Sequence, residues 1–489
     1  MHTPKHRVID ALLVGVQPLG CLGRLKPELQ RRLRRACLWF TLFLATTNLT
    51  FAADSLVWHG EQNRVDAEIQ SWDLEKLLQK IAANTGWQIF VEPQTAHTVS
   101  VKFKNLPQGD ALRSLLGNLN FALLPQTNGS PRLFVFRTSL QEATQLVRGP
   151  ASSSKSGSAK PIPNELIVSL KPGSKVNIDD LARLLGAKVI GRIDGLNAYR
   201  LQFENEAAAQ AARDTLVANQ DVAQVDFNFP IERPVPAESL LASSFPPLQL
   251  KPKAPGDNDR IIVGLIDTAL QSLGGNLDAF LLPSIAVAGE AQPNSGLPTH
   301  GTSMAETILR SLDAMGKGSS SVQILPVDVY GKSSTTTTFD VAYGIYSAVN
   351  AGANPINLSL GSSGDSTFLH NVIQSANQQG VLFFAAAGNE PVTTPTYPAA
   401  YPEVVAVTAG DRQGQIASYA NRGSFVDIVT PGASIFYFNG RAFYVNGTSA
   451  ATAYATGIAA GRAEQTGQTL SKVESDMLKT LAVKPASSP

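Results

Sequence analysis

The sequence predicts an α/β fold in which a doubly wound, mainly parallel sheet over residues 258–489 is preceded by two small α+β domains. After residue 258, apolar strand-like runs alternate with amphipathic helical patterns, which is typical of a parallel sheet with helices on both faces. Before it, residues 54–140 and 164–231 each mix strand and helix patterns, and a linker rich in Ser, Gly and Pro separates them at residues 141–163. Each element is justified in turn below.

Residues 1–53 have the features of a signal peptide with a long n-region. Arginines at positions 31, 32, 34 and 35 precede an apolar stretch from Ala36 to Phe51, and Phe51-Ala52-Ala53 offers small residues for cleavage. A transmembrane anchor and a lipid anchor on Cys21 are the alternatives, but the apolar stretch is shorter than the ~20 residues that a span requires. We therefore expect export to the periplasm, the outer membrane or the outside of a Gram-negative bacterium.

Composition limits the function classes. The chain of 489 residues is 43% hydrophobic, which allows cores for several domains. Removing residues 1–53 leaves 32 Lys and Arg against 37 Asp and Glu, so a nucleic-acid partner is excluded on charge. Both cysteines, Cys21 and Cys37, lie in that segment, and the mature chain is predicted to have no disulfide.

Residues 54–140 are predicted to fold as βαββαββ. A strand at Val65–Ile69 leads to a helix that stops before Gly86, and strands at Trp87–Val91 and Val99–Phe103 precede a second helix and two short strands. This order, with Asn84-Thr85-Gly86, resembles the short N-terminal domain of secretins and TonB-dependent receptors. The resemblance implies docking to a periplasmic or outer-membrane assembly, while an unrelated small α+β module is the alternative.

Residues 164–231 are predicted to follow the order βαββαβ, a split two-layer sandwich. Its first strand is Leu166–Leu170 and its last is Ala223–Phe227. Residues 232–257 are rich in proline with little periodicity, so they cannot form a central strand or the interior of a helix.

Three separate motifs in residues 258–489 supply an acid, a base and a nucleophile. Asp267 ends the apolar run that starts at Ile261, His300 opens His-Gly-Thr, and Ser449 lies among small residues at a helix start. The order acid, base, nucleophile is one of those in which the Ser-His-Asp triad arose. Each motif alone also fits a turn aspartate, a chance match or a helix cap. The other histidine of this region, His370, lacks a glycine-rich context and is expected at the surface.

These motifs resemble the subtilisin family of serine peptidases. The resemblance implies that Asp267 orients His300, that His300 activates Ser449 as the nucleophile, and that Asn389 donates a hydrogen bond to the oxyanion. It also assigns substrate binding to two groups of residues, a backbone edge at Ser359, Leu360 and Gly361 and a pocket wall at Ala386, Ala387 and Gly388. The chain departs from the family pattern at Ala269, Ser303, Glu306, Ala450 and Ala453, none of which replaces a catalytic group.

Before a subtilisin-like region, residues 164–231 resemble the family's propeptide, which implies that they block the cleft until the processing linker at residues 232–257 is cut. The predicted function is a secreted serine endopeptidase made as a zymogen, acting on proteins or peptides through an acyl-enzyme on Ser449. The alternative is a subtilisin-like pseudoprotease that serves as a binding or assembly module at the cell envelope. No cofactor is expected for the chemistry. Structural Ca²⁺ is implied by the family resemblance only, because no Asp/Asn-rich ligand loop stands out.

Overall fold

The computed structural model describes residues 54–483, apart from 125–129, 148–158, 241–245, 255–259, 292, 294–295 and 317. The predicted signal peptide, both cysteines and parts of both predicted linkers lie outside the described residues. The described residues from Ser55 onward pack as one unit. None of the helices described in it combines the length and the apolar character that crossing a bilayer requires.

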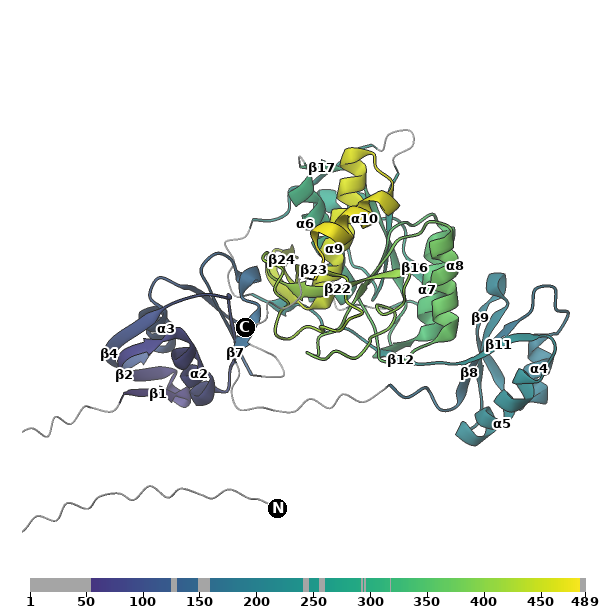
Figure 1. The fold of residues 1–489 in the computed structure, drawn as a ribbon, viewed down its shortest axis with the longest axis horizontal. Coiled ribbons are helices and arrows are strands. Elements are labelled where there is room, and N and C mark those ends of the chain that lie inside the picture. The colour runs from purple at the N-terminus through teal and green to yellow at the C-terminus, as the bar shows by residue number, and fades with distance from the viewer. Residues whose placement is uncertain are drawn as a thin grey trace, which may run out of the picture. The chain divides into compact units, whose positions relative to one another are not determined.

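A sheet of seven parallel strands forms the centre of the C-terminal region (residues 260–483), as the sequence predicts (Figure 1). The strands, in spatial order, are β16 (Ile285–Ala286), β18 (Gln323–Asp328), β15 (Ile262–Asp267), β20 (Ile356–Leu358), β21 (Phe383–Ala386), β22 (Val404–Gly410) and β23 (Ile428–Pro431). Along the sequence, β16 and β18 are added on one side of β15, and the strands from β20 to β23 are then added on its other side. The sheet therefore has its topological switch point between β15 and β20, where open α/β sheets place their working residues.

Helices cover both faces of this sheet because its strands are apolar on both sides. Ile262 and Ile266 of β15 face the cluster that includes the two helices α7 (Thr338–Asn350) and α8 (Thr367–Gln378), whereas Val263 and Leu265 face the other side. That other side holds α6 (His300–Met315), α9 (Thr448–Thr466) and α10 (Leu470–Thr480). The side chain of His370 of α8 is 30% exposed, so it lies at the surface as expected, and it stacks on Tyr401 and hydrogen-bonds to Glu403 at 2.8 Å.

The middle region (residues 164–231) has the predicted βαββαβ order. Its elements are β8 (Glu165–Leu170), α4 (Ile178–Leu184), β9 (Lys188–Ile193), β10 (Ala198–Gln202), α5 (Glu206–Val217) and β11 (Val222–Phe227). The strands form an antiparallel sheet in the order β11-β8-β10-β9. Leu166 and Val168 of β8 pack with Ala209 and Leu216 of α5 in a core of their own.

The N-terminal region (residues 55–147) contains every element that the sequence predicts, with one additional strand at each end. Its elements are β1 (Ser55–His59), β2 (Arg64–Asp73), α2 (Leu74–Thr85), β3 (Gln88–Val91), β4 (Thr98–Pro107), α3 (Gln108–Leu116), β5 (Asn120–Leu124), β6 (Arg132–Phe136) and β7 (Gln145–Val147). They form two sheets, β1-β2-β4 and β5-β6-β3-β7, around a shared apolar core. The separation of this region and the middle region into independent domains stays a prediction.

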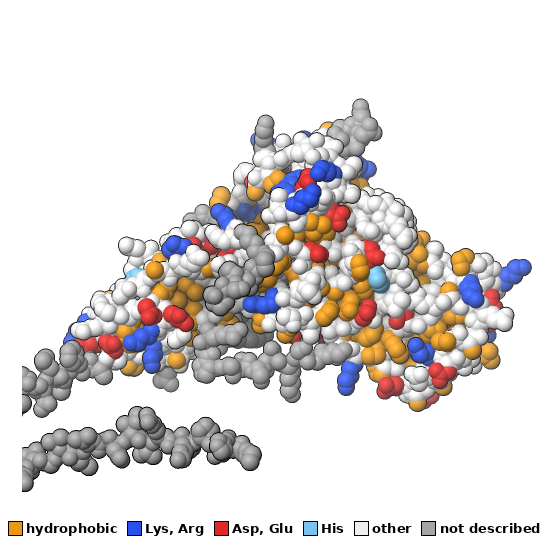
Figure 2. All heavy atoms as spheres, in the orientation of Figure 1, with side chains coloured by type: hydrophobic (Ala, Val, Ile, Leu, Met, Phe, Trp, Pro, Cys, Tyr) orange, Lys and Arg blue, Asp and Glu red, His pale blue; other side chains and the backbone are white. Residues whose placement is uncertain are grey.

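Short strands outside the main sheet connect the regions by strand pairing. They are β12 (Pro230–Glu232), β13 (Glu238–Ser239), β14 (Lys251–Pro252), β17 (Ser319–Ser320), β19 (Thr335–Thr337), β24 (Ala433–Phe438) and β25 (Arg441–Asn446). The Pro-rich segment thus supplies only edge strands, consistent with its composition. Figure 2 shows basic and acidic side chains interspersed over the visible face, rather than gathered into the single basic surface that nucleic-acid binding needs.

Candidate active site

Asp267 and His300 form a buried pair at the carboxyl edge of the sheet. Asp267 is the last residue of β15 and is 0% exposed, and His300 is the first residue of α6 and is 4% exposed. Both carboxylate oxygens of Asp267 lie 2.9 Å from Nδ1 of His300. The carboxylate therefore holds the proton on Nδ1, which leaves Nε2 free to accept a proton.

The His-Gly-Thr motif sets this geometry. A Cβ at Gly301 would lie 2.3 Å from the carbonyl oxygen of Thr268, so only glycine allows α6 to begin this close to the end of β15. Gly301 N also donates to Thr268 Oγ1 at 2.9 Å, and the hydroxyl of Thr299 caps the helix by accepting from Thr302 N. Ala269 is not among the described residues with positive φ, so its Cβ is tolerated where the family usually has glycine.

Ser303 and Glu306, two departures from the family pattern, are engaged elsewhere on α6. Ser303 Oγ donates to Thr299 O at 2.9 Å. Glu306 is 2% exposed and pairs with Arg310 at 3.2 Å. Burial raises the pKa of Glu306, because desolvation disfavours its charged form by more than Arg310 stabilises it. Neither substitution removes a group from the Asp267–His300 pair.

Ser449 lies in the first turn of α9, beside the switch point. Its Oγ donates to Ser359 O at 3.1 Å, and Ser359 Oγ donates to Ser449 O at 3.0 Å. Ile266 pairs with Leu358, so Ser359 continues β20 level with Asp267 on the neighbouring strand. The structure thus brings Ser449 to the same edge of the sheet as the Asp267–His300 pair. In the described residues no hydrogen bond joins Ser449 Oγ to His300, and such bonds are often long in free enzymes and tighten with substrate.

The amide of Asn389 is oriented by the start of α9. Its Oδ1 accepts from Thr448 N at 2.8 Å and from Thr448 Oγ1 at 3.1 Å. A backbone N–H can only donate, so the amide oxygen must face Thr448 and Nδ2 must face away from it. Gly447, with φ of 134°, passes so close that a Cβ would lie 3.0 Å from Nδ2. Asn389 is therefore held with its donor available beside Ser449.

The residues assigned to substrate binding are mostly buried. Ser359, Leu360, Ala386 and Ala387 are at most 5% exposed, so these residues are covered in the unprocessed chain. Gly361 and Gly388 are more open, but a Cβ at Gly388 would collide with the amide of Asn421, which donates to Ala387 O at 2.7 Å. The sequence analysis gave Asn421 no role. It closes the space behind the predicted pocket wall.

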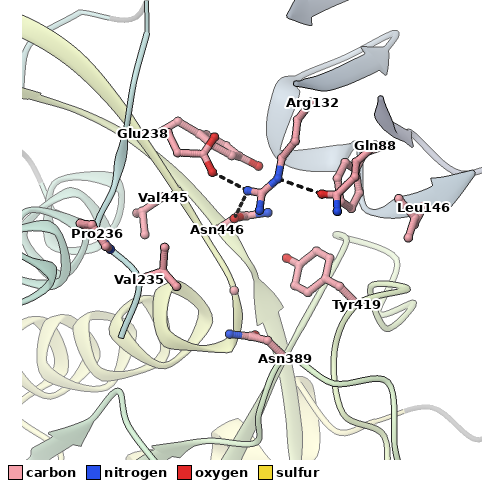
Figure 3. A pocket seen from close by; sticks show the side chains of 13 residues that line it. Gln88, Arg132, Leu146, Val235, Pro236, Glu238, Asn389, Tyr419, Val445 and Asn446 are labelled. Carbon is pink, nitrogen blue, oxygen red and sulfur yellow. Dashed lines mark hydrogen bonds and ion pairs between the residues drawn. The ribbon is translucent and has the colours of Figure 1, made fainter. Parts of the chain in front are cut away.

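A strap, defined as residues 230–239, crosses this edge of the sheet and was not predicted. On one side of Ser449, β12 pairs with β19, with Ile231 opposite Thr336. On the other side, β13 pairs with β25, with Glu238 opposite Tyr444. Between them, Val235 and Pro236 line a pocket of about 280 Å³ together with Asn389 and Gly447 (Figure 3). None of the six residues assigned to substrate binding lines this pocket.

The middle region meets the ends of α7 and α8 through two polar side chains. Asn228 is 0% exposed and its Oδ1 accepts from Phe339 N at 3.2 Å, near the start of α7. Asp226 accepts from Phe368 N at 2.8 Å, near the start of α8. Acceptors of this kind satisfy the free N–H groups of a helix N-terminus and interact favourably with its dipole. Among the described residues, no group of three or more His, Cys, Asp or Glu side chains is arranged to hold a metal ion.

The fold and the Asp267–His300 pair define an α/β protein of subtilisin-like architecture. The crystal structure of fervidolysin from Fervidobacterium pennivorans, a keratinolytic enzyme related to subtilisin, matches with a TM-score of 0.50 and 19% identity, over 65% of this chain and 57% of that chain. The model of the Subtilase family, Peptidase_S8, matches residues 258–487, and the chain belongs to this family. The model of the fervidolysin N-terminal prodomain matches residues 148–228, which includes most of the middle region.

Two curated relatives agree with this membership. The thermophilic serine proteinase of Bacillus sp. (strain AK1) is 32% identical over 208 residues, which are 42% of this chain and 52% of the relative. Subtilisin Savinase of Lederbergia lenta is 35% identical over 189 residues, which are 36% of this chain and 70% of the relative. The chain spans about half the length of several other curated relatives that it matches. The match to secretin-like domains is not supported by these comparisons.

Proposed function

We propose that this chain is a serine endopeptidase made as a zymogen, which hydrolyses peptide bonds through an acyl-enzyme on Ser449. The observation that carries the proposal is the buried pair of Asp267 and His300 at the switch point of the sheet, with Ser449 on a helix start at the same edge. Family membership supports the same chemistry. The departures from the family pattern leave these three groups in place.

The proposed reaction uses side chains of this chain alone. Ser449 Oγ attacks the carbonyl carbon of the substrate while Nε2 of His300 takes its proton, and Asp267 stabilises the imidazolium that forms. The oxyanion accepts from Nδ2 of Asn389 and from backbone N–H groups at the start of α9. The imidazolium then protonates the leaving amine, and a water activated by His300 hydrolyses the ester and restores Ser449.

The strap supports the zymogen part of the proposal. Peptide segments bind protease clefts by adding a strand to an exposed edge, and β12 does this on β19. Ile231 of the strap is 1% exposed, and Arg233 N donates to Ser334 O at 2.9 Å. A segment held in this way occupies the path of a substrate, so we assign residues 164–231 as the propeptide and propose that the strap masks Ser449 until it is cut.

Labelling with a fluorophosphonate tests the catalytic part. The processed wild type should react at Ser449, whereas Ser449→Ala, folded to the same extent by circular dichroism, should not. The matched control is Ser272→Ala, which changes an exposed serine of the same region. Absence of labelling in processed wild-type protein would favour a pseudoprotease.

Processing tests the zymogen part. The wild type should cut itself to give an N-terminal fragment that ends between Glu232 and Asp259, and the position of the strap predicts that the cut lies at its central residues, which line the pocket with Asn389. Ser449→Ala should remain full length, because self-cleavage needs the nucleophile. The same fragment from Ser449→Ala would show that another protease cuts the chain.

Three further expectations remain part of this proposal. Export follows from residues 1–53 and is tested by cell fractionation. Docking of residues 54–140 to an envelope assembly rests on the pattern resemblance and is tested by cross-linking in whole cells. Structural Ca²⁺ rests on family resemblance, and its test is a change in melting temperature on chelation.

A further inference from the structure

The N-terminal region contributes to the wall of the pocket beside Ser449. Figure 3 shows Arg132 of β6 and Gln88 of β3 reaching the pocket that Asn389 lines from the opposite side. Arg132 Nε donates to Gln88 Oε1 at 3.2 Å, which fixes the plane of the guanidinium group. This cation therefore lies next to the cleft but belongs to a part of the chain that the family model does not cover.

The N-terminal region is held against the C-terminal region by contacts that do not depend on the middle region. Phe134 stacks edge-on against Tyr444 with ring centroids 5.1 Å apart, and both side chains are at most 2% exposed. Ser418 N donates to Thr144 O at 3.0 Å, and Gln145 donates to Ile416 O at 3.2 Å. The apolar part of this interface comprises Phe90, Leu124, Phe134, Leu140 and Ala143 against Leu240, Ala433, Ile435, Ala442 and Tyr444.

Aromatic and aliphatic groups buried to this extent stabilise an interface independently of a covalent link. Apart from Leu240, which lies just beyond the strap, the apolar residues on the C-terminal side belong to the hairpin of β24 and β25. Cutting the strap leaves that hairpin intact. The N-terminal region is therefore built to remain in place as a wall of the open cleft.

The contacts of the strap indicate which kind of substrate side chain can bind to this wall of the cleft. Glu238 forms an ion pair with Arg132, and the side chains are 16% and 24% exposed respectively. Arg132 also lies 3.4 Å from Asn446 Oδ1, at the end of the strand with which β13 pairs. Val235 and Pro236 line the same pocket as Asn389, and Glu238 follows them by three and two residues. A substrate on the same path would present its second or third residue after the cleaved bond to Arg132.

We propose that Arg132 forms a subsite for acidic side chains, which makes the enzyme prefer substrates with Asp or Glu at the second or third residue on the C-terminal side of the cleaved bond. The inference rests on the proposed peptidase function, and it adds a substrate class to it. The carboxylate of Glu238 stands in for the substrate carboxylate in the unprocessed chain. A planar guanidinium group suits this role because it binds carboxylates with directed, charge-assisted hydrogen bonds.

The test uses the full chain after self-processing and internally quenched peptides in which one Glu, or one Gln as the uncharged match, moves through the five positions after the cleaved bond. The wild type should show its highest kcat/KM for Glu at the second or third position, with a Glu/Gln ratio on the order of tenfold, as one partly exposed charged pair provides. This ratio should fall as salt concentration rises.

Substitutions of Arg132 test whether the preference for Glu depends on the charge of this side chain rather than on the folding of the region. Arg132→Ala should bring the Glu/Gln ratio close to one, and Arg132→Glu should favour Lys over Glu at the same position. The matched control is Arg113→Ala, which removes an arginine of the same region that pairs with exposed Asp110. This variant should keep the wild-type ratio. Size-exclusion chromatography of the processed enzyme should show the N-terminal fragment travelling with the catalytic fragment.

Several outcomes would overturn the subsite. Equal rates for the Glu and Gln peptides in the wild type, a ratio that survives in Arg132→Ala, or release of the N-terminal fragment on processing would each refute it while the peptidase function stands. Failure of the processed wild type to hydrolyse any peptide would refute the proposed function, and the subsite would fall with it.

Discussion

Replacing Asp267 by asparagine tests the arrangement of the site most directly. Asp267 is fully buried, and both of its carboxylate oxygens lie 2.9 Å from Nδ1 of His300. Asparagine keeps the shape of the side chain but removes its charge. It can also turn its NH₂ group toward Nδ1, which favours the tautomer with the proton on Nε2 and blocks proton abstraction from Ser449.

The expected magnitude follows from this geometry. Two unit charges about 4 Å apart interact by about 4 kcal/mol at an effective dielectric constant of about 20, and the imidazolium of the transition state loses this interaction. With the unfavourable tautomer added, the barrier should rise by about 4–6 kcal/mol, which lowers kcat by roughly 10³- to 10⁴-fold. The same substitution in another Ser-His-Asp protease lowers kcat by about 10⁴-fold.

The assay must separate catalysis from processing, because Asp267→Asn should not cut its own strap. Tagged wild-type enzyme in trace amount processes the variant in trans and is then removed, and kcat is measured on a quenched peptide. The control is Asp278→Asn, which changes an exposed aspartate of the same region. A loss of less than about tenfold, in protein shown to be folded, would refute the role assigned to Asp267.

Three other substitutions test separate parts of the proposal. Asn389→Ala should lower kcat by about 10²- to 10³-fold with little change in KM, the loss known for such a donor in subtilisin. Ile231→Ala should speed fluorophosphonate labelling of Ser449 in the unprocessed chain by about 30- to 1,000-fold, because emptying this 1%-exposed site weakens the strap by about 2–4 kcal/mol. Glu306→Gln should gain stability relative to wild type between pH 4 and pH 8 in urea unfolding. Burial raises the pKa of Glu306 above its usual 4.5, so wild-type stability from this group is lost as pH rises through the folded value.

For each of these three substitutions, one outcome would contradict the prediction. An exposed asparagine, Asn371→Ala, should leave kcat unchanged, and an equal effect at both asparagines would remove the oxyanion role of Asn389. Val217 is 62% exposed in the middle region, so Val217→Ala should not alter labelling, and an unchanged rate in Ile231→Ala would mean that the strap does not mask Ser449. Parallel stability curves for wild type and Glu306→Gln would show that Glu306 keeps its usual pKa.

Local patterns predicted the elements of the fold well because each element is encoded by neighbouring residues. Continuous apolar runs gave the buried parallel strands, and Asp267 was placed at a strand end before the sheet was known. The contacts of His370 with Glu403 and Tyr401 were not predicted, because these partners lie about thirty residues away in the sequence. Contacts of that kind leave no periodic signal in a single chain.

The strap illustrates what composition can and cannot determine. Prolines at positions 230, 234 and 236 lack an N–H and exclude a central strand, which the sequence analysis stated correctly. An edge strand needs partners on one side only, and two or three residues suffice when the partner strand is already formed. The pairing of Ile231 with Thr336 and of Glu238 with Tyr444 joins segments more than a hundred residues apart, so it depends on a cleft that exists only after the C-terminal region has folded. The position of Arg132 beside that cleft also depends on the folded C-terminal region. The sequence of β6 alone therefore could not indicate a role for Arg132 in substrate binding.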